Sequence, residues 1–166
     1  MSEKTKILNK KQLDEKIHRL AWEIYERNYS EKELIIVGVK KRGVELSERI
    51  SYVLRDISDI QIKSATVSVD KEKPLSSDIN IDLDEVDFRN KVVILVDDVL
   101  NSGKTLIYAA KQFLSVPLIK LSTVVLVNRN HNIYPIKADY VGISLSTSLQ
   151  EHVNVVFGKK EGVYLS

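Results

Sequence analysis

The segment Lys91–Thr105, KVVILVDDVLNSGKT, decides how the rest of the chain is interpreted. Its apolar run, Val92–Val96, is short and rich in β-branched residues, which is typical of a strand buried on both faces of a parallel sheet. Asp97 and Asp98 follow at once, so we expect them at the carboxyl end of that strand. Open α/β sheets bind their ligands at this edge, and the segment therefore predicts an acidic ligand site there.

A short turn follows the two acids and leads directly into a helical pattern. The turn supplies an amide, two hydroxyls, a glycine and a cation, from Asn101, Ser102, Gly103, Lys104 and Thr105. Backbone N–H groups in such a turn point into one concavity at a helix N-terminus, which suits a phosphate group. The simpler alternative is that Asp98 and Ser102 only cap the helix, but a cap needs one such residue and not the whole set.

A nucleoside triphosphate loop is the first competing interpretation of this turn. Gly103-Lys104-Thr105 matches the end of the pattern Gly-x4-Gly-Lys-Ser/Thr, but that pattern also needs a glycine where Asp98 stands. The pair Gly38 and Gly43 has the right spacing, yet Val-Glu follows it in place of Lys-Ser/Thr. Neither segment therefore makes a triphosphate loop.

The bulk composition limits the architecture and the partners. The chain has 166 residues, of which 43% are hydrophobic. This is enough for one well-buried core and too little for two ordinary domains, so we expect a single domain over residues 1–166. The 25 basic and 23 acidic side chains give a formal charge of +2, which provides no bulk attraction for nucleic acid or a membrane. Any anion site must be local.

The sequence also favours a cytosolic location. It contains no cysteine, which excludes disulfides and thiolate metal sites and fits the reducing cytosol. The N-terminus is charged and no apolar segment reaches membrane-spanning length, so we expect neither secretion nor membrane insertion.

Hydrophobic periodicity outlines alternating helices and strands. A capping box of Asn9 and Gln12 starts a helix that runs to about Asn28. Further helical patterns cover 46–57 and end near 114, and strands are expected at 34–39, 92–96, 121–127, 140–143 and 153–157. Short alternations over 60–83 predict an antiparallel excursion or hairpin with a polar tip. The alternation of strands and helices predicts a parallel sheet covered on both faces.

The segment Val92–Thr105 resembles the phosphoribosyl-pyrophosphate (PRPP) signature of type I phosphoribosyltransferases: an apolar strand, two acids, and a loop ending Ser/Thr-Gly-x-Thr. The wider resemblance is to the bacterial pyrimidine attenuation regulator and uracil phosphoribosyltransferase branch. It extends over Ile24–Asn28, Gly38–Gly43 and Ala138–Gly142. It implies an α/β fold, a mainly parallel twisted sheet flanked by helices, with a small hood and a short antiparallel hairpin.

The resemblance also implies roles for individual residues. Asp97 and Asp98 would hold the ribose hydroxyls, and the turn at 101–105 would hold the 5′-phosphate. The pyrophosphate would be bound by Lys40, Lys41, Arg42 and Gly43, although a solvated surface turn is the simpler explanation of such a basic triplet. Mg²⁺ is the expected cofactor, held mainly through substrate oxygens and water and not by a protein metal site.

Base choice is predicted from Asn128, Arg129 and Asn101. In the hypoxanthine and guanine branch, the positions matching Asn101 and Asn128 are usually Asp and Lys, but both are Asn here. A neutral amide cannot accept a proton at neutral pH, so an oxopurine is the less favoured alternative. Asn128 and Arg129 are therefore expected to bind the base, with uracil as the substrate and UMP and pyrophosphate as products.

Two departures from the family pattern bear on catalysis and on RNA. The hairpin Val69–Asp78 is short and lacks the Tyr-Arg pair that closes over the sugar in relatives. His18 and Trp22 stand where the regulators carry Thr and His on the first helix, although Arg27 persists.

These departures leave two alternatives to an enzyme: an RNA-binding regulator that senses nucleotide, and a non-catalytic phosphate binder. We further expect a homodimer by analogy, and Trp22 in the core, with a subunit contact as the alternative. His18 and His152 are expected to be ordinary surface or helix-face residues, and His131 to lie in the base loop without a favoured role.

Overall fold

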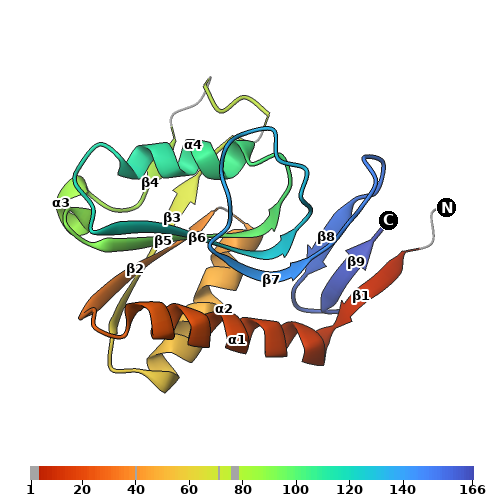
Figure 1. Ribbon diagram of the computed structural model, residues 1–166, viewed down its shortest axis with the longest axis horizontal. Coiled ribbons are helices and arrows are strands. Elements are labelled where there is room, and N and C mark those ends of the chain that lie inside the picture. The colour runs from red at the N-terminus through yellow and green to blue at the C-terminus, as the bar shows by residue number, and fades with distance from the viewer. Residues whose placement is uncertain (1–3, 40, 71, 76–78) are drawn as a thin grey trace.

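The computed structural model describes residues 4–39, 41–70, 72–75 and 79–166, and shows a helix–sheet–helix arrangement with a small second sheet beside it (Figure 1). The main sheet has the strand order β4-β3-β2-β5-β6-β7. Its strands are β2 (Glu33–Val39), β3 (Gln61–Ser68), β4 (Asn80–Ile81), β5 (Val92–Leu100), β6 (Lys120–Asn128) and β7 (Tyr140–Ser144). All neighbours pair in parallel except β3 and β4. The expected fold class is confirmed.

Helices cover both faces of this sheet. The helices are α1 (Lys10–Asn28), α2 (Arg42–Ile57), α3 (Glu85–Phe88) and α4 (Lys104–Phe113). Figure 1 shows α1 and α2 below the sheet and α4 above it. Consecutive residues of β5 alternate between the two cores, Ile94 and Val96 with α1 and α2, Val93 and Leu95 with α4. This double burial explains why β5 reads as a continuous apolar run.

The start of α1 follows the expected capping box. The N–H of Gln12 donates to the side chain of Asn9 at 2.9 Å, and the N–H of Asn9 donates to the side chain of Gln12 at 2.9 Å. This exchange gives a hydrogen-bond acceptor to two backbone N–H groups at the N-terminus of α1. Among the described residues, no helix is long and apolar enough to cross a bilayer.

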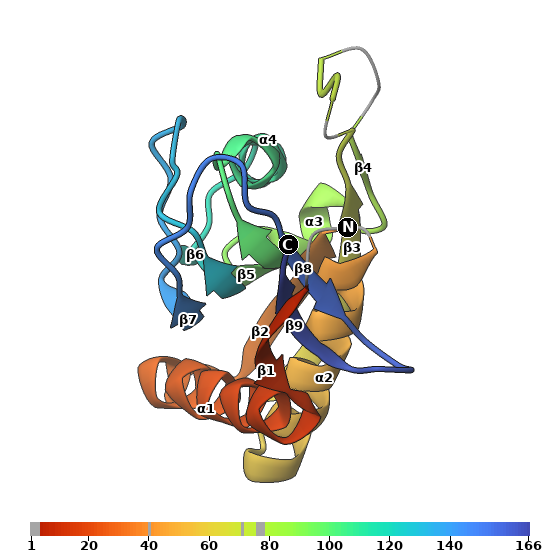
Figure 2. The ribbon, with the colours of Figure 1, turned by 90° about the vertical axis from the view of Figure 1, so that its right-hand side faces the viewer.

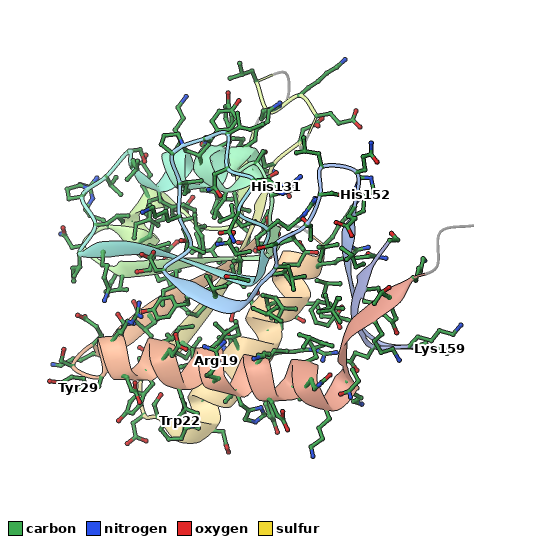
Figure 3. The ribbon with its side chains drawn as sticks, turned by 45° about the vertical axis from the view of Figure 1, so that its right-hand side comes forward. Arg19, Trp22, Tyr29, His131, His152 and Lys159 are labelled. Carbon is green, nitrogen blue, oxygen red and sulfur yellow. The ribbon has the colours of Figure 1, made fainter. Side chains whose placement is uncertain are left out.

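The expected core position of Trp22 is wrong. Its side chain is 47% exposed, on the outer side of α1 (Figure 3). It contacts Tyr25 edge to face, with ring centroids 6.0 Å apart. The buried stripe of α1 is made instead by Leu13, Ile17, Leu20, Ala21 and Ile24, and position 22 falls beside that stripe on the helical wheel.

The segment from 60 to 83 also differs from expectation. Its first part forms β3, which pairs in parallel with β2 from Gln61 to Val67. Only the two residues of β4 pair antiparallel with β3, so the predicted hairpin is confined to that short contact. The alternating pattern of β3 arises because this strand lies near the edge of the sheet, where one face is more exposed.

A three-stranded antiparallel sheet, here called the hood, stands beside the carboxyl edge of the main sheet (Figure 2). It consists of β1 (Thr5–Asn9), β9 (Gly162–Leu165) and β8 (Val153–Val156). The sequence predicted β8 but missed β1 and β9, because each is short and finds its partner at the opposite end of the chain.

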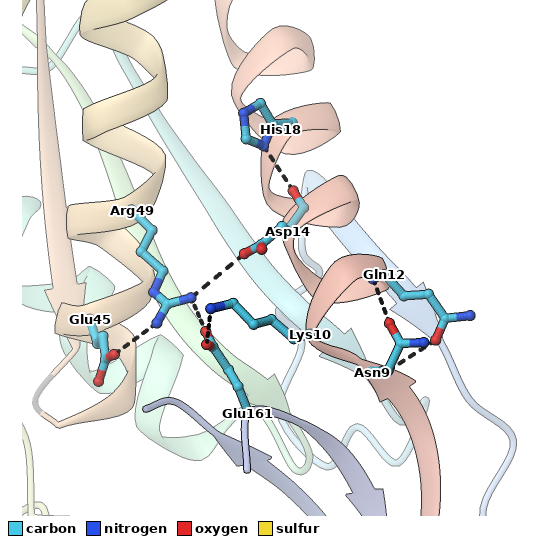
Figure 4. Close-up of polar contacts among 8 residues, drawn as sticks. All are labelled: Asn9, Lys10, Gln12, Asp14, His18, Glu45, Arg49 and Glu161. Atoms are coloured by element: carbon cyan, nitrogen blue, oxygen red, sulfur yellow. Dashed lines mark hydrogen bonds and ion pairs between the residues drawn. The ribbon is translucent and has the colours of Figure 1, made fainter. Parts of the chain in front are cut away.

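Arg49 of α2 joins the hood to the core through a charged cluster (Figure 4). Its guanidinium forms ion pairs with Glu161 at the start of the β9 hairpin arm, with Glu45 at 3.2 Å and with Asp14 at 3.8 Å. It also lies 4.7 Å from the ring centroid of Phe157. The side chain of Glu161 is only 6% exposed, so this carboxylate depends on its cationic neighbours for stability.

Candidate functional site

A cavity of about 340 Å³ opens between the carboxyl edge of the main sheet and the hood. Three loops meet around this edge, because β2, β5 and β6 are adjacent and parallel. The lining residues include Arg42, Asp97, Asp98, Asn101, Ser102, Gly103, Lys104, Thr105, Arg129, His152 and Val153. The segments that the sequence predicted to gather at this edge are therefore close together.

The two acids lie inside β5 and not after it, since the strand continues to Leu100. Asp97 is 4% exposed and Asp98 is 6% exposed. The backbone N–H of Asp98 donates to Oδ1 of Asp97 at 2.9 Å, and Oδ2 of Asp98 lies 3.7 Å from Nη1 of Arg42. Buried carboxylates need such partners, and the pair gives the cavity an acidic floor beside a cation.

The turn after β5 has the backbone that a phosphate cradle needs. Gly103 precedes α4 with φ 85°, a left-handed conformation that favours glycine. A Cβ at this position would lie 2.6 Å from Cγ2 of Ile136, so the turn is also closely packed. The carbonyl of Ser102 accepts two hydrogen bonds, at 2.8 and 3.0 Å, from the amides of Ile133 and Tyr134. The loop after β6 therefore braces the turn.

The residues of the basic loop before α2 differ in whether they line the cavity. Lys40 lies outside the described residues. Lys41 caps α2 with φ 73° and ψ −114°, an unusual conformation for a residue with a side chain, and it does not line the cavity, whereas Arg42 does. Gly43 packs directly on β5, because a Cβ there would lie 2.7 Å from the carbonyl oxygen of Val96.

The two residues expected at the base occupy different environments. Asn128 ends β6 outside the cavity lining, and its Oδ1 accepts from the N–H of Asn130 at 2.9 Å. Arg129 lines the cavity and is 5% exposed. Its guanidinium donates to Asn101, which belongs to the turn at 101–105, and to the segment 147–151 next to the hood.

Sequence reasoning missed two residues of the cavity wall, His152 and Val153. His152 was expected to be an ordinary surface or helix-face residue; it is exposed at the surface and also lines the cavity. His131, in the base loop, has its Nε2 2.8 Å from the carbonyl oxygen of Thr147. No local pattern marks His152 and Val153 as cavity residues, since their positions depend on the hood folding back over the sheet.

One carboxylate near the cavity has a shifted pKa. The N–H of Ser148 donates to Oε2 of Glu151 at 2.6 Å. This bond, together with the Ser148 side chain and the charge of Arg129, lowers the pKa of Glu151 below its usual 4.5. The turn 148–151 is therefore closed by an ionised group. Within the described ranges, no cluster of three or more His, Asp or Glu side chains is placed to hold a metal ion.

Comparisons with known proteins agree on the family. The model of the phosphoribosyl transferase domain matches residues 4–161. The Bifunctional protein PyrR of Clostridium acetobutylicum is 36% identical over 162 residues, covering 93% of this chain and 91% of the relative. The protein of the same name from Thermoanaerobacter sp. strain X514 is 35% identical over 173 residues, covering 98% and 96%. The predicted resemblance to this branch is confirmed.

Solved structures agree on the fold. A hypoxanthine-guanine phosphoribosyltransferase from Bacillus anthracis has a TM-score of 0.71 at 23% identity, covering 86% of this chain and 84% of that one. A Trypanosoma cruzi hypoxanthine phosphoribosyl transferase has a TM-score of 0.74 at 18% identity, covering 87% and 79%. These identities are too low to carry substrate choice. The family model, the PyrR relatives and the shared fold together show that the chain belongs to the type I phosphoribosyltransferases.

Proposed function

We propose that the chain transfers the 5-phosphoribosyl group from PRPP to uracil, giving UMP and pyrophosphate. One observation carries this proposal: two buried acids, a glycine turn at a helix N-terminus and an arginine line the same cavity. Adjacent acidic and anion-binding groups are what a sugar phosphate with free hydroxyls requires. We also propose that the protein acts in the cytosol and, by analogy with the family, as a homodimer.

The chemistry follows from these groups. The C1–O bond to pyrophosphate breaks, the base nitrogen bonds to C1, and the base loses the proton that this nitrogen carried. The sugar becomes oxocarbenium-like during the exchange, as in glycoside hydrolysis. Asp97 and Asp98 would hold the 2′ and 3′ hydroxyls and favour that cation electrostatically. Arg42, with Lys40 and Lys41, would neutralise the leaving group, and the 101–105 turn would fix the 5′-phosphate.

Mg²⁺ fits the groups present in the cavity. Carboxylates are hard oxygen donors of the type that this ion prefers, and Asp97 and Asp98 supply two at the floor. The ion would be bound mainly by substrate oxygens and water beside these acids. When bound, it would neutralise charge on the diphosphate, while Arg42 and the turn orient the two ends of the substrate.

Uracil is proposed on the basis of the relatives and of two amides. The sequence relatives carry the name PyrR, and the positions matching the purine-reading residues are Asn101 and Asn128. Asn101 lines the cavity, where its side-chain oxygen is already bonded to Arg129 at 3.2 Å. Asn128 does not line the cavity; its Oδ1 already accepts from the N–H of Asn130, while its amide nitrogen would be a donor for the base edge.

A base panel tests the proposal. Purified protein is incubated with PRPP, Mg²⁺ and radiolabelled uracil, hypoxanthine or guanine, and the nucleoside monophosphates are separated. We expect UMP as the main product. Preferential IMP or GMP would replace uracil by an oxopurine, and transfer to no base despite PRPP binding would leave only a non-catalytic phosphate binder.

An RNA regulator is the second candidate function. The relatives are named bifunctional proteins, and Arg27 remains on the exposed side of α1. Its guanidinium donates to the carbonyl of Asp139 at 3.1 Å and lies 4.7 Å from the Tyr140 ring centroid, so a purely structural role also explains it. Gel shifts with the chain's own pyrimidine leader transcripts, with and without UMP, decide. Absence of nucleotide-dependent binding removes this function.

A further inference from the structure

Arg129 is a buried cation whose hydrogen bonds join three segments around the cavity. Its Nε donates to Oγ1 of Thr147 at 3.0 Å, and its Nη1 donates to Oδ1 of Asn101 at 3.2 Å. Its Nη2 donates to the carbonyl oxygens of Ser148 at 3.1 Å and Glu151 at 2.6 Å. Its own backbone N–H donates to the carbonyl of Leu100 at the end of β5, at 3.0 Å.

These bonds leave the guanidinium little capacity for a substrate. An arginine side chain has about five N–H donors in a fixed planar fork, and the four bonds above occupy all but one at Nη1. All four acceptors are uncharged oxygens, and among the described residues Arg129 has no carboxylate within ion-pair distance. The geometry is that of a brace between backbone segments.

The segment that Arg129 holds leads directly into the cavity wall. Residues 147–151 connect β7 to the hood, and His152 and Val153 follow them and line the cavity. Two further contacts fix the same segment: Nε2 of His131 lies 2.8 Å from the Thr147 carbonyl oxygen, and Glu151 accepts from the N–H of Ser148. Among the described residues, the hydrogen bond from Arg129 to Asn101 is what links this cluster to the turn at 101–105.

We propose that Arg129 is a positioning residue: it holds the segment 147–153, whose His152 and Val153 line the cavity, in register with the turn at 101–105, and so affects base binding in that cavity without contacting the base. This inference rests on the proposed transferase function for its kinetic test. It departs from the sequence-based expectation that Arg129 itself binds the base, because the donors that would read a base edge are occupied by the protein.

The kinetic test separates the base site from the PRPP site. With PRPP and Mg²⁺ saturating, Arg129→Ala should raise the KM for uracil about tenfold or more, with kcat changed less. PRPP affinity, measured by calorimetry without base, should change by less than about threefold. The matched control is Arg55→Ala, an exposed arginine of α2 whose guanidinium donates to Ile62 and Ser64 of β3 and does not line the cavity, and it should leave both constants unchanged.

A second variant keeps the test decisive if Arg129→Ala folds poorly. Thr147→Val removes the Nε acceptor while leaving Arg129 in place, and should raise the uracil KM in the same direction by about two- to fivefold. The double variant should be no worse than Arg129→Ala alone, since both changes break one link. An unchanged KM in Thr147→Val, or multiplied effects in the double variant, would mean that Arg129 contacts the base directly and would overturn the proposal.

Hydrogen exchange distinguishes this failure from failure of the transferase function. In the free protein, Arg129→Ala should accelerate amide exchange over 147–151 while β5 and β6 keep their protection. This result does not depend on turnover, so it supports the brace even if the wild type transfers to no base. Unchanged exchange over 147–151 would overturn the brace even if the wild type makes UMP.

Discussion

The floor of the cavity and its hood wall enclose the same space but are held by different forces. The floor comes from one continuous segment, Asp97–Thr105, whose strand pairs with β2 on one side and β6 on the other. The wall comes from Thr147–Val153, which is held by side chains of the loop after β6 and by the hood sheet.

This difference suggests that the floor binds the sugar phosphate while the wall discriminates between bases. A strand fixed by backbone pairing on both sides keeps its position whatever side chains surround it, so the floor is suited to the constant part of the substrate, the sugar phosphate. A wall fixed by a few side-chain hydrogen bonds changes shape when one residue changes. Substrate discrimination should therefore reside in the wall, and the following variants test that separation from the largest expected effect to the smallest.

Changes to the acidic floor should have the largest effect. Asp97→Asn or Asp98→Asn removes negative charge from the place where the sugar becomes cationic, so kcat should fall about a hundredfold or more. Steady-state kinetics with PRPP and uracil measures this loss. Asp59→Asn, at an exposed position, is the charge-matched control. Retained turnover in both floor variants would contradict the assignment of the floor as the sugar site.

Two glycines with similar φ angles allow the cost of backbone strain to be separated from the cost of a steric clash when each is replaced by alanine. Gly103 has φ 85° and Gly158, in the hood hairpin, has φ 89°. A Cβ on Gly103 would meet Ile136 at 2.6 Å, whereas one on Gly158 would meet nothing within 4 Å. Gly158→Ala should lower the free energy of unfolding by about 1 kcal/mol, and Gly103→Ala by about 2–3 kcal/mol.

Of the two variants, Gly103→Ala should also weaken PRPP binding, because Gly103 belongs to the turn proposed to bind the 5′-phosphate. Denaturant titration measures the two stabilities, and calorimetry measures the affinity. Equal losses of stability would mean that the loop after β6 moves aside and does not brace the turn.

The ion pair between Arg49 of α2 and Glu161 next to the hood should matter more for stability than for turnover. Arg49→Ala leaves the buried Glu161 with Lys10, at 3.7 Å, as its remaining cation. We expect the free energy of unfolding to fall by about 2 kcal/mol, while the uracil KM changes less than in Arg129→Ala. Thermal denaturation with parallel kinetics measures both.

Removing both charges provides the control for this prediction. The double variant Arg49→Met, Glu161→Gln should recover part of the lost stability, since it no longer buries an unpaired carboxylate. A double variant less stable than Arg49→Ala would contradict the role assigned to the buried carboxylate.

The smallest expected effect is on the titration of the Glu151 carboxylate, which closes the turn 148–151 in the wall. Because the folded protein lowers the pKa of Glu151, its hydrogen bond stabilises the turn above the unfolded pKa and is lost as pH falls through the folded value. An NMR titration of the side-chain carboxyl should therefore give a midpoint below 4.5. Ser148→Pro removes the N–H donor and should raise the midpoint toward that value. A midpoint at or above 4.5 in the wild type would show that this bond does not form.

The floor could be predicted from the sequence because its physics is local. The buried run, the two acids and the glycine turn are contiguous, so periodicity and turn chemistry predicted the strand and the turn, although β5 continues past both acids to Leu100. The capping box at Asn9 was predicted in the same way. The wall could not be predicted, because His152 reaches the cavity only after β1 and β9 pair across the full length of the chain.

Two other errors have physical causes. The alternation in β3 was taken for an antiparallel pattern because a strand near a sheet edge is exposed on one face in either orientation. Trp22 was expected inside because large aromatic rings are usually buried, but its position on α1 lies outside the apolar stripe. Burial by residue type is a weaker guide than burial by helical phase.

The contact between Gly43 and β5 has a consequence for redesign. Because α2 rests on the Val96 carbonyl through a residue without a side chain, the spacing between the loop proposed to bind pyrophosphate and the proposed sugar site is set by two main chains in direct contact. Grafting a different hood onto this scaffold should therefore transplant a new base preference while the donor end of the reaction keeps its dimensions.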